Sequence, residues 1–279
     1  DEIQPLTNHI ERISIVHNGN IPIFRGHDTT ELFNIMLNHD NFENKLVEIM
    51  DNIVASYSLI IMINDTFYVM KDRYGIRPLC FGKKDNKIII SSESCALKGC
   101  RYVNEVQSGQ IIKINQDGIF QIYLHPKSID GICIFEFLYF MNKDSIYKNT
   151  KVEEIRFKLG EMLAKKEKLI SKDYIVVGIP SSGISAAISY AKFLNLEYSQ
   201  SIKKTNDNSC DRTFIIPENS ERIKACKKKF KYSIEYLNNK KIIIVDDTIV
   251  RGNVIKTIIS ELKYIGVKEI HIRIPAPPV

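Results

Sequence analysis

The spacing of apolar residues changes near residue 150 of the chain, and the two halves predict different kinds of fold. Up to about residue 125, short apolar runs alternate with turn sequences such as Asn64-Asp65 and Asp117-Gly118, which is typical of antiparallel hairpins. Residues 28–38 instead carry apolar residues at helical spacing behind an acidic start. The first half therefore predicts an α+β fold.

After residue 150 the pattern alternates between helix and strand. Apolar residues recur every three or four positions in the helical segments, whereas the strand segments are short and almost continuously apolar. This alternation is typical of βαβ units around a parallel sheet. The expected helices are 152–170, 184–194 and 254–265, and the expected strands are 173–180, 242–245 and 269–279.

Residues 242–245 are Ile and Val without alternation, which indicates a strand buried on both faces. The strand ends at Asp246 and Asp247, whose burial and mutual repulsion are costly unless a cation or hydrogen-bond donors offset them. Backbone N–H groups of the next loop, with Gly252 allowing close approach, can bind a phosphate at the start of a helix. The two carboxylates would then bind neutral sugar hydroxyls, or a Mg²⁺ ion that the ligand brings. The segment therefore predicts a site for a sugar phosphate with a free diol.

Composition narrows the class of protein. The chain has 279 residues, of which 44% are hydrophobic and 26% charged, as in globular proteins of one or two domains. A net charge of +6 is too small and too dispersed to indicate nucleic-acid binding. No apolar run approaches the roughly 18 residues that span a bilayer, so we expect no membrane association.

The six cysteines show no CxxC spacing, which favours reduced thiols and a cytoplasmic protein. The opening sequence, "DEIQPLTNHI", has no Met and no features of a signal peptide. We therefore expect that the chain starts in the middle of a longer protein.

The segment "IIIVDDTIVRGN" at 242–253 resembles the phosphoribosylpyrophosphate (PRPP) motif of phosphoribosyltransferases, in the extended form of the glutamine PRPP amidotransferases. Further motifs follow in the order typical of that family. They are "HNGN" at 17–20, "KDRYGIRPLCFG" at 71–82, "SSESCAL" at 91–97, "CIFEFLYF" at 133–140, "GIPSSGISAA" at 178–187, "RTFIIP" at 212–217 and "KEIHIRIPAPPV" at 268–279. The resemblance covers essentially the whole chain.

The resemblance implies two domains. Residues 1–130 would form an α+β N-terminal-nucleophile glutaminase domain that lacks its first part. Residues 131–279 would form an α/β type I phosphoribosyltransferase domain, truncated at its C-terminal end. Such enzymes use ammonia, free or derived from glutamine, to displace pyrophosphate from PRPP with Mg²⁺. The product is 5-phosphoribosylamine, the first intermediate of purine synthesis, and the resemblance implies a homo-oligomer with purine nucleotides as feedback ligands.

The resemblance also assigns PRPP-binding residues. Asp246 and Asp247 would hold the ribose hydroxyls and Mg²⁺, with Ser182 as a further metal ligand. The loop from Pro180 to Gly183 would present backbone donors to pyrophosphate, although from the pattern alone it is also typical of an ordinary turn. Its Ser181 stands where relatives usually carry an acid. The residues expected around the 5-phosphate are Thr248, Ile249, Val250, Arg251, Gly252 and Asn253.

In the first half, "HNGN" resembles the oxyanion hole of the glutaminase, with Asn18 and Gly19 as donors. Taken alone, this tetrapeptide is typical of a hairpin turn. Asp28 matches the acid that binds the α-ammonium of glutamine. The family nucleophile is a processed N-terminal Cys, and because the chain begins at Asp1 we expect no glutaminase activity from the chain as given. Cys133 matches an iron–sulfur ligand of some relatives, but we expect no cluster here.

One departure from the family leaves an alternative open. Residues 203–211 read "KKTNDNSCD", where relatives carry an Arg-Tyr pair in a loop that closes over PRPP. Together with the absent nucleophile, this loop favours a second hypothesis, a non-catalytic regulatory homologue that binds PRPP or nucleotides. A third, a salvage phosphoribosyltransferase for a purine base, conflicts with the glutaminase-like first half.

Overall fold

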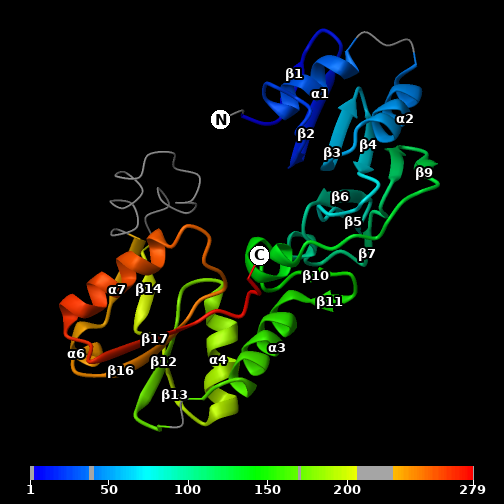
Figure 1. Ribbon diagram of the computed structural model, residues 1–279. Helices are drawn as coiled ribbons and strands as arrows, with labels where there is room; N and C mark the ends of the chain where they lie inside the picture. The colour runs from blue at the N-terminus through cyan, green and yellow to red at the C-terminus, as the bar shows by residue number, and fades with distance from the viewer. Residues whose placement is uncertain (1–2, 38–40, 169–170, 206–228, 279) are drawn as a thin grey trace. The chain divides into compact units, whose positions relative to one another are not determined.

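The computed structural model describes residues 3–37, 41–168, 171–205 and 229–278. The chain forms two compact units (Figure 1): the first contains Asp1–Ile134 and Ser145–Asn149, and the second contains Phe135–Asp144 and Thr150–Val279. The predicted boundary between residues 130 and 131 stays a prediction. Residues 206–211 of the altered loop, the motif at 212–217, Cys210 and Cys226 lie outside the described residues.

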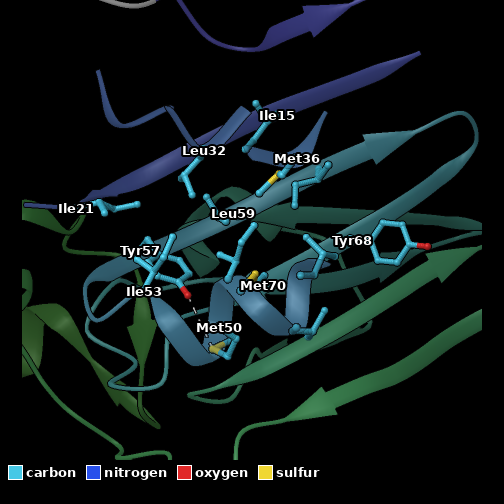
Figure 2. Packing of buried hydrophobic residues seen from close by; sticks show 14 of the residues in the cluster. Ile15, Ile21, Leu32, Met36, Met50, Ile53, Tyr57, Leu59, Tyr68 and Met70 are labelled. Carbon is cyan, nitrogen blue, oxygen red and sulfur yellow. Dashed lines mark hydrogen bonds between the residues drawn. The ribbon is translucent and has the colours of Figure 1, made fainter. Parts of the chain in front are cut away.

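The first unit is built on an antiparallel six-stranded sheet in the order β1-β2-β3-β4-β8-β9. Alternation along β3 sends Tyr57, Leu59 and Ile61 to one face, where they meet the apolar sides of the two helices α1 and α2 (Figure 2). The helices are α1 (Asp28–Met36) and α2 (Phe42–Asn52), and the strands are β1 (Leu6–Asn8), β2 (Ile13–Asn20), β3 (Ser56–Ile63), β4 (Thr66–Lys71), β8 (Gln110–Asn115) and β9 (Gly118–Leu124).

A second, three-stranded sheet completes the first unit, in the order β6-β5-β7. A smaller apolar cluster that includes Val69, Leu79, Val106 and Ile112 joins it to the six-stranded sheet, with Phe81 packed at the margin. The remaining elements of this unit are β5 (Cys80–Lys84), β6 (Lys87–Ser91), β7 (Tyr102–Glu105), the 3₁₀ turn η1 (Ser94–Leu97) and β10 (Ile146–Tyr147). The antiparallel hairpins predicted for this half are confirmed, whereas α2 was not predicted.

The second unit has a four-stranded parallel sheet in the order β13-β12-β16-β17. Helix α7 covers one face, with Ile258 and Leu262 against Ile242 and Ile244. Helix α4 covers the other face, where Tyr190 packs with Val176 and Ile243. The sheet consists of β12 (Tyr174–Gly178), β13 (Glu197–Ser199), β16 (Lys241–Val245) and β17 (Glu269–Arg273). The helices are α3 (Val152–Lys165), α4 (Gly183–Leu194) and α7 (Asn253–Ile265).

Shorter elements complete the second unit. They are the π-helical turn η2 (Glu136–Phe140), β11 (Thr150–Lys151), the antiparallel pair β14 (Ile202–Lys204) and β15 (Phe230–Tyr232), and α6 (Ile234–Leu237). The pattern did not predict η2. No helix among the described residues is long and apolar enough to cross a membrane.

The helix expected over 152–170 was too long, because α3 ends at Lys165. Residue Glu167 leaves the helical path and its carboxylate accepts two hydrogen bonds from Arg273 of β17, of 2.6 Å from Nε and 2.9 Å from Nη2. Tyr190 Oη also hydrogen-bonds the same carboxylate. This tertiary interaction outweighs the helical pattern of residues 166–168.

Candidate functional site

The two predicted acids lie together where β16 ends. Asp246 and Asp247 are 8% and 5% exposed. The N–H of Asp247 donates to Asp246 Oδ1 at 2.9 Å, and the Thr248 hydroxyl donates to Asp247 Oδ1 at 2.8 Å. On the β17 side, the N–H of Asp246 donates to the carbonyl of Arg273 at 3.2 Å. The strand end therefore fixes both carboxylates in a nearly dry environment.

Burial makes negative charge at this position costly. It raises the pKa of Asp246 to about 8, and the neighbouring Asp247 carboxylate adds to the increase. Burial also raises the pKa of Asp247, although the Ser182 and Thr248 hydroxyls and the charge of Arg156 oppose it. The positive charge of Lys229 likewise lowers the pKa of Asp246 and so opposes the effect of burial. A bound cation or hydrogen-bond donors would relieve the repulsion.

A second loop, residues 180–183, connects β12 to α4 beside these acids. Helix α4 begins at Gly183, where a Cβ atom would lie 2.6 Å from the carbonyl oxygen of Val245, so only glycine allows this approach. The peptide bond between Pro180 and Ser181 is cis. Because Ser182 interacts with Asp247, the predicted pyrophosphate loop and the acidic loop meet at one side chain.

The predicted 5-phosphate loop runs from Thr248 to Asn253 and leads into α7. Gly252 has a φ of 73° and immediately precedes the helix, so it supplies a left-handed residue that side chains disfavour. The amide N–H groups at the start of α7 have no partners within the helix itself, and the helix dipole favours an anion there. The loop thus has the backbone features of a phosphate site.

These loops line one pocket of about 360 Å³ in the second unit. Of the residues predicted to bind PRPP, all except Ser181 and Gly183 line this pocket. The sequence did not assign the other side of the pocket, which is formed by Phe135, Tyr139, Phe140, Lys229 and Phe230. The residue types of the motif "CIFEFLYF" at 133–140 do not by themselves show that a π-helical turn brings its rings to the pocket.

The donor set at the acids fits a divalent cation that arrives with its ligand. Asp247 Oδ2 is buried and has no hydrogen-bond partner in the part of the chain that the structure describes. Among those residues, no group of three or more His, Cys, Asp or Glu side chains gathers into a complete metal site. Mg²⁺ is typically bound through one or two carboxylates together with substrate oxygens and water. Asp246 and Asp247 therefore fit the incomplete protein share of such a site.

In the first unit, the predicted oxyanion residues lie on β2. Asn18 pairs with Ser58 and Gly19 with Tyr57 on β3, and a Cβ atom on Gly19 would lie 2.4 Å from the carbonyl oxygen of Ser56. Asp28 starts α1, and its Oδ2 accepts a 2.7 Å hydrogen bond from the N–H of Ile21. Strand β2 and the loop after it therefore place these three residues on neighbouring segments, and their binding roles stay predictions.

Cys133 is half-buried, and like Cys80, Cys95 and Cys100 it forms no disulfide within the described part of the chain. It precedes η2 in sequence and does not line the pocket. Its correspondence to a cluster ligand rests on the sequence resemblance alone.

The parallel sheet covered by helices on both faces, with paired acids and two loops at its carboxyl edge, defines the second unit as a phosphoribosyltransferase-type domain. Residues 144–276 match the family model described as phosphoribosyl transferase domain.

Over most of its length the chain is related to amidophosphoribosyltransferases. It is 34% identical to the enzyme of Methanothermobacter thermautotrophicus over 86% of this chain and 50% of the relative. It is 36% identical to the enzyme of Rattus norvegicus over 84% of this chain and 48% of the relative, and 31% identical to that of Archaeoglobus fulgidus over 96% and 62%. The chain thus spans about half the length of the first two of these curated relatives.

The solved structure of glutamine PRPP amidotransferase from B. subtilis, complexed with ADP and GMP, is similar to the chain with a TM-score of 0.82 and 28% identity. The match covers 99% of this chain and 65% of that structure. These comparisons confirm the resemblance to the glutamine PRPP amidotransferases that the sequence motifs predicted.

Proposed function

We propose that the second unit binds PRPP together with Mg²⁺ and transfers its phosphoribosyl group to ammonia, as an amidophosphoribosyltransferase. The observation that carries the proposal is the buried pair Asp246 and Asp247, which shares a pocket with a glycine-containing loop at a helix N-terminus. A ligand with a diol at one end and phosphates at the other satisfies both features. The family of the relatives supports the same reaction.

The residues of the chain would act mainly by positioning. The two carboxylates would accept hydrogen bonds from the ribose hydroxyls, and the loop Thr248–Asn253 would bind the 5-phosphate through backbone N–H groups. Ser182 and its loop would face the pyrophosphate. Asp246, Asp247 and Ser182 would hold Mg²⁺, whose positive charge would favour departure of pyrophosphate.

In the reaction, the nitrogen of ammonia forms a bond to C1 of the ribose while the bond from C1 to the pyrophosphate oxygen breaks. Pyrophosphate leaves with the bonding electron pair, and the new ammonium group passes a proton to solvent. Since positive charge develops on the sugar ring, orientation and electrostatic stabilisation supply the rate.

We further propose that the first unit is glutaminase-like and binds glutamine, with Asn18 and Gly19 as oxyanion donors and Asp28 at the glutamine α-ammonium. Its antiparallel α+β architecture and the match of the whole chain to the B. subtilis enzyme support this assignment. Because that enzyme was solved with ADP and GMP, we also propose purine nucleotides as feedback ligands. A cytoplasmic homo-oligomer is part of the same proposal.

The test is calorimetry of PRPP binding with and without Mg²⁺, combined with an assay of ammonia-dependent pyrophosphate release. We expect Mg²⁺-dependent binding and turnover. A folded chain that binds no PRPP would overturn the proposal, whereas binding without turnover would favour the non-catalytic regulatory alternative. Asp173→Asn, an exposed acid just before β12, serves as a charge-matched control for variants of the buried acids.

A further inference from the structure

Arg156 is a buried arginine in helix α3 that does not line the pocket itself. Its side chain is 6% exposed and reaches two backbone carbonyls of another element. Nε donates to the carbonyl of Phe137 at 2.8 Å, and Nη2 donates to the carbonyl of Met141 at 2.8 Å. The two hydrogen bonds use the forked geometry of the guanidinium, which a lysine ammonium cannot reproduce.

The segment that Arg156 holds is the π-helical turn η2. The N–H of Met141 donates to the carbonyl of Glu136 at 3.0 Å, which closes this single wide turn. A turn of five residues has few hydrogen bonds of its own, and its terminal carbonyls need partners when they are buried. Arg156 therefore supplies partners for two backbone carbonyls in and just after this turn.

The turn carries the aromatic side of the pocket. Phe135, Tyr139 and Phe140 line the same space as Asp246 and Asp247, and the rings of Tyr139 and Phe140 pack edge to face with centroids 5.6 Å apart. The positive charge of Arg156 also lowers the pKa of Asp247, against the effect of burial. One buried cation thus touches the backbone of the aromatic wall and influences the acidic loop opposite.

We propose that Arg156 is a positioning residue that seats the aromatic wall, namely Phe135, Tyr139 and Phe140, against the acidic loop and so excludes water from the reacting carbon. This inference rests on the proposed function, because it concerns the choice between two acceptors of the phosphoribosyl group. With ammonia, a C–N bond replaces the bond to pyrophosphate. With water, a C–O bond replaces it, ribose 5-phosphate forms, and a proton again passes to solvent.

The test compares Arg156→Lys and Arg156→Gln with Lys158→Gln, which removes an exposed positive charge from the same helix. Ribose 5-phosphate and pyrophosphate are quantified at several ammonia concentrations. We expect both Arg156 variants to raise the hydrolysed share of PRPP about fivefold or more and to lower kcat/KM for ammonia about tenfold, as a misplaced wall would. The PRPP Kd should change by less than about threefold, because the phosphate loop is untouched. The control should match the parent in each measurement.

A second arm needs no PRPP. The chain contains no Trp, so Tyr139→Trp places a single indole in the wall. Its acrylamide quenching should increase in the Arg156→Lys background and not in the Lys158→Gln background. Unchanged quenching together with an unchanged hydrolysed share would overturn the proposal.

Failure of the proposed function can be distinguished from failure of the inference about Arg156. A parent chain that binds no PRPP refutes the proposed function, while quenching still decides whether Arg156 seats the wall. Cooperative urea unfolding of each variant is measured first, and Arg156→Lys carries the test if Arg156→Gln does not fold.

Discussion

At the scale of single residues, the carboxylates of Asp246 and Asp247 are placed where charge is costly. Each is almost fully buried, and burial raises the pKa of both. A protein that only needed stability would gain by replacing them with neutral groups of the same shape. The cost is consistent with a site that binds its cation and sugar hydroxyls by relieving that repulsion.

The double variant Asp246→Asn, Asp247→Asn should separate binding from stability. We expect PRPP affinity to fall by about 3 kcal/mol or more, because two charge-assisted contacts are lost. The ligand-free chain should resist urea better than the parent, since the buried repulsion is gone. Calorimetry and urea unfolding measure the two effects, and Asp173→Asn should change neither. Equal PRPP affinity in the double variant and the parent would show that the acids do not bind the ligand.

The acids and their loop were predictable from sequence, whereas Lys229 and Phe230 were not assigned to the site. Residues 242–253 are contiguous, so their order alone indicates a strand, a loop and a helix. Lys229 and Phe230 reach the pocket at the start of β15, which pairs with β14 in the second unit. That placement depends on strand pairing over a long stretch of sequence, which local pattern does not specify.

Lys71 offers a pH test in the first unit. It is 2% exposed and its Nζ lies 5.4 Å from the ring centroid of Tyr147. Burial lowers its pKa below the usual 10.5, although Glu105 partly opposes the shift. Between the folded pKa and 10.5, the unfolded chain holds a proton that the folded chain lacks, so stability from this group rises with pH.

We therefore expect the free energy of unfolding of the parent to rise relative to Lys71→Met as pH increases toward 10.5. The slope is at most about 1.4 kcal/mol per pH unit, because one proton is involved. Urea unfolding of both proteins at several pH values between 7 and 10.5 measures it. Parallel pH profiles would contradict the shift.

At the scale of elements, helix α3 packs unusually closely on α4. A Cβ atom on Gly160 would lie 2.1 Å from the carbonyl oxygen of Ala186 and 2.2 Å from Ser189 Oγ. Ser189 Oγ in turn donates to the carbonyl of Phe157 at 2.7 Å. Glycine in mid-helix costs roughly 1 kcal/mol relative to alanine, so its presence here reflects this contact.

Gly160→Ala should therefore destabilise the second unit despite the better helix propensity of alanine. We expect a net loss of about 1–3 kcal/mol, since the helices must move apart. Urea unfolding checks the prediction, with Glu161→Ala at an exposed position of the same helix as the control. An increase in stability for Gly160→Ala would mean that α3 and α4 adjust at no cost.

Sequence pattern predicted β16 and α7, which lead into and out of the acidic loop, better than α2, the end of α3 or η2. Strand β16 and helix α7 lie within one residue of the predicted ranges, because continuous Ile and Val and a clear helical stripe specify them. The end of α3 was wrong because the Glu167 ion pair with Arg273 depends on tertiary structure. Turn η2 was missed for a related reason, since Arg156 supplies hydrogen bonds that its own sequence lacks.

At the scale of the whole molecule, the two units have separate apolar cores. The main core of the first unit contains Leu59 of β3 and Met50 of α2, which pack between the helices and the six-stranded sheet (Figure 2). The second has one core on each face of its parallel sheet, with Ile243 in the α4 core. Because each core lies within one unit, we expect each unit to unfold as its own cooperative step.

Ligand binding should then act on one step alone. All residues of the candidate pocket lie in the second unit, so Mg²⁺ with PRPP at about 100 times Kd should stabilise that step by about 2.7 kcal/mol. Leu59→Ala, which opens a cavity in the first unit, should lower only the other step, by about 2–5 kcal/mol, and leave PRPP affinity unchanged. Ile243→Ala is the matched variant in the second unit and should lower the ligand-sensitive step. Calorimetric melts of the parent, Leu59→Ala and Ile243→Ala, with and without ligand, test this prediction. A single transition in every melt, shifted as one by the ligand and by either substitution, would show that the two units unfold together.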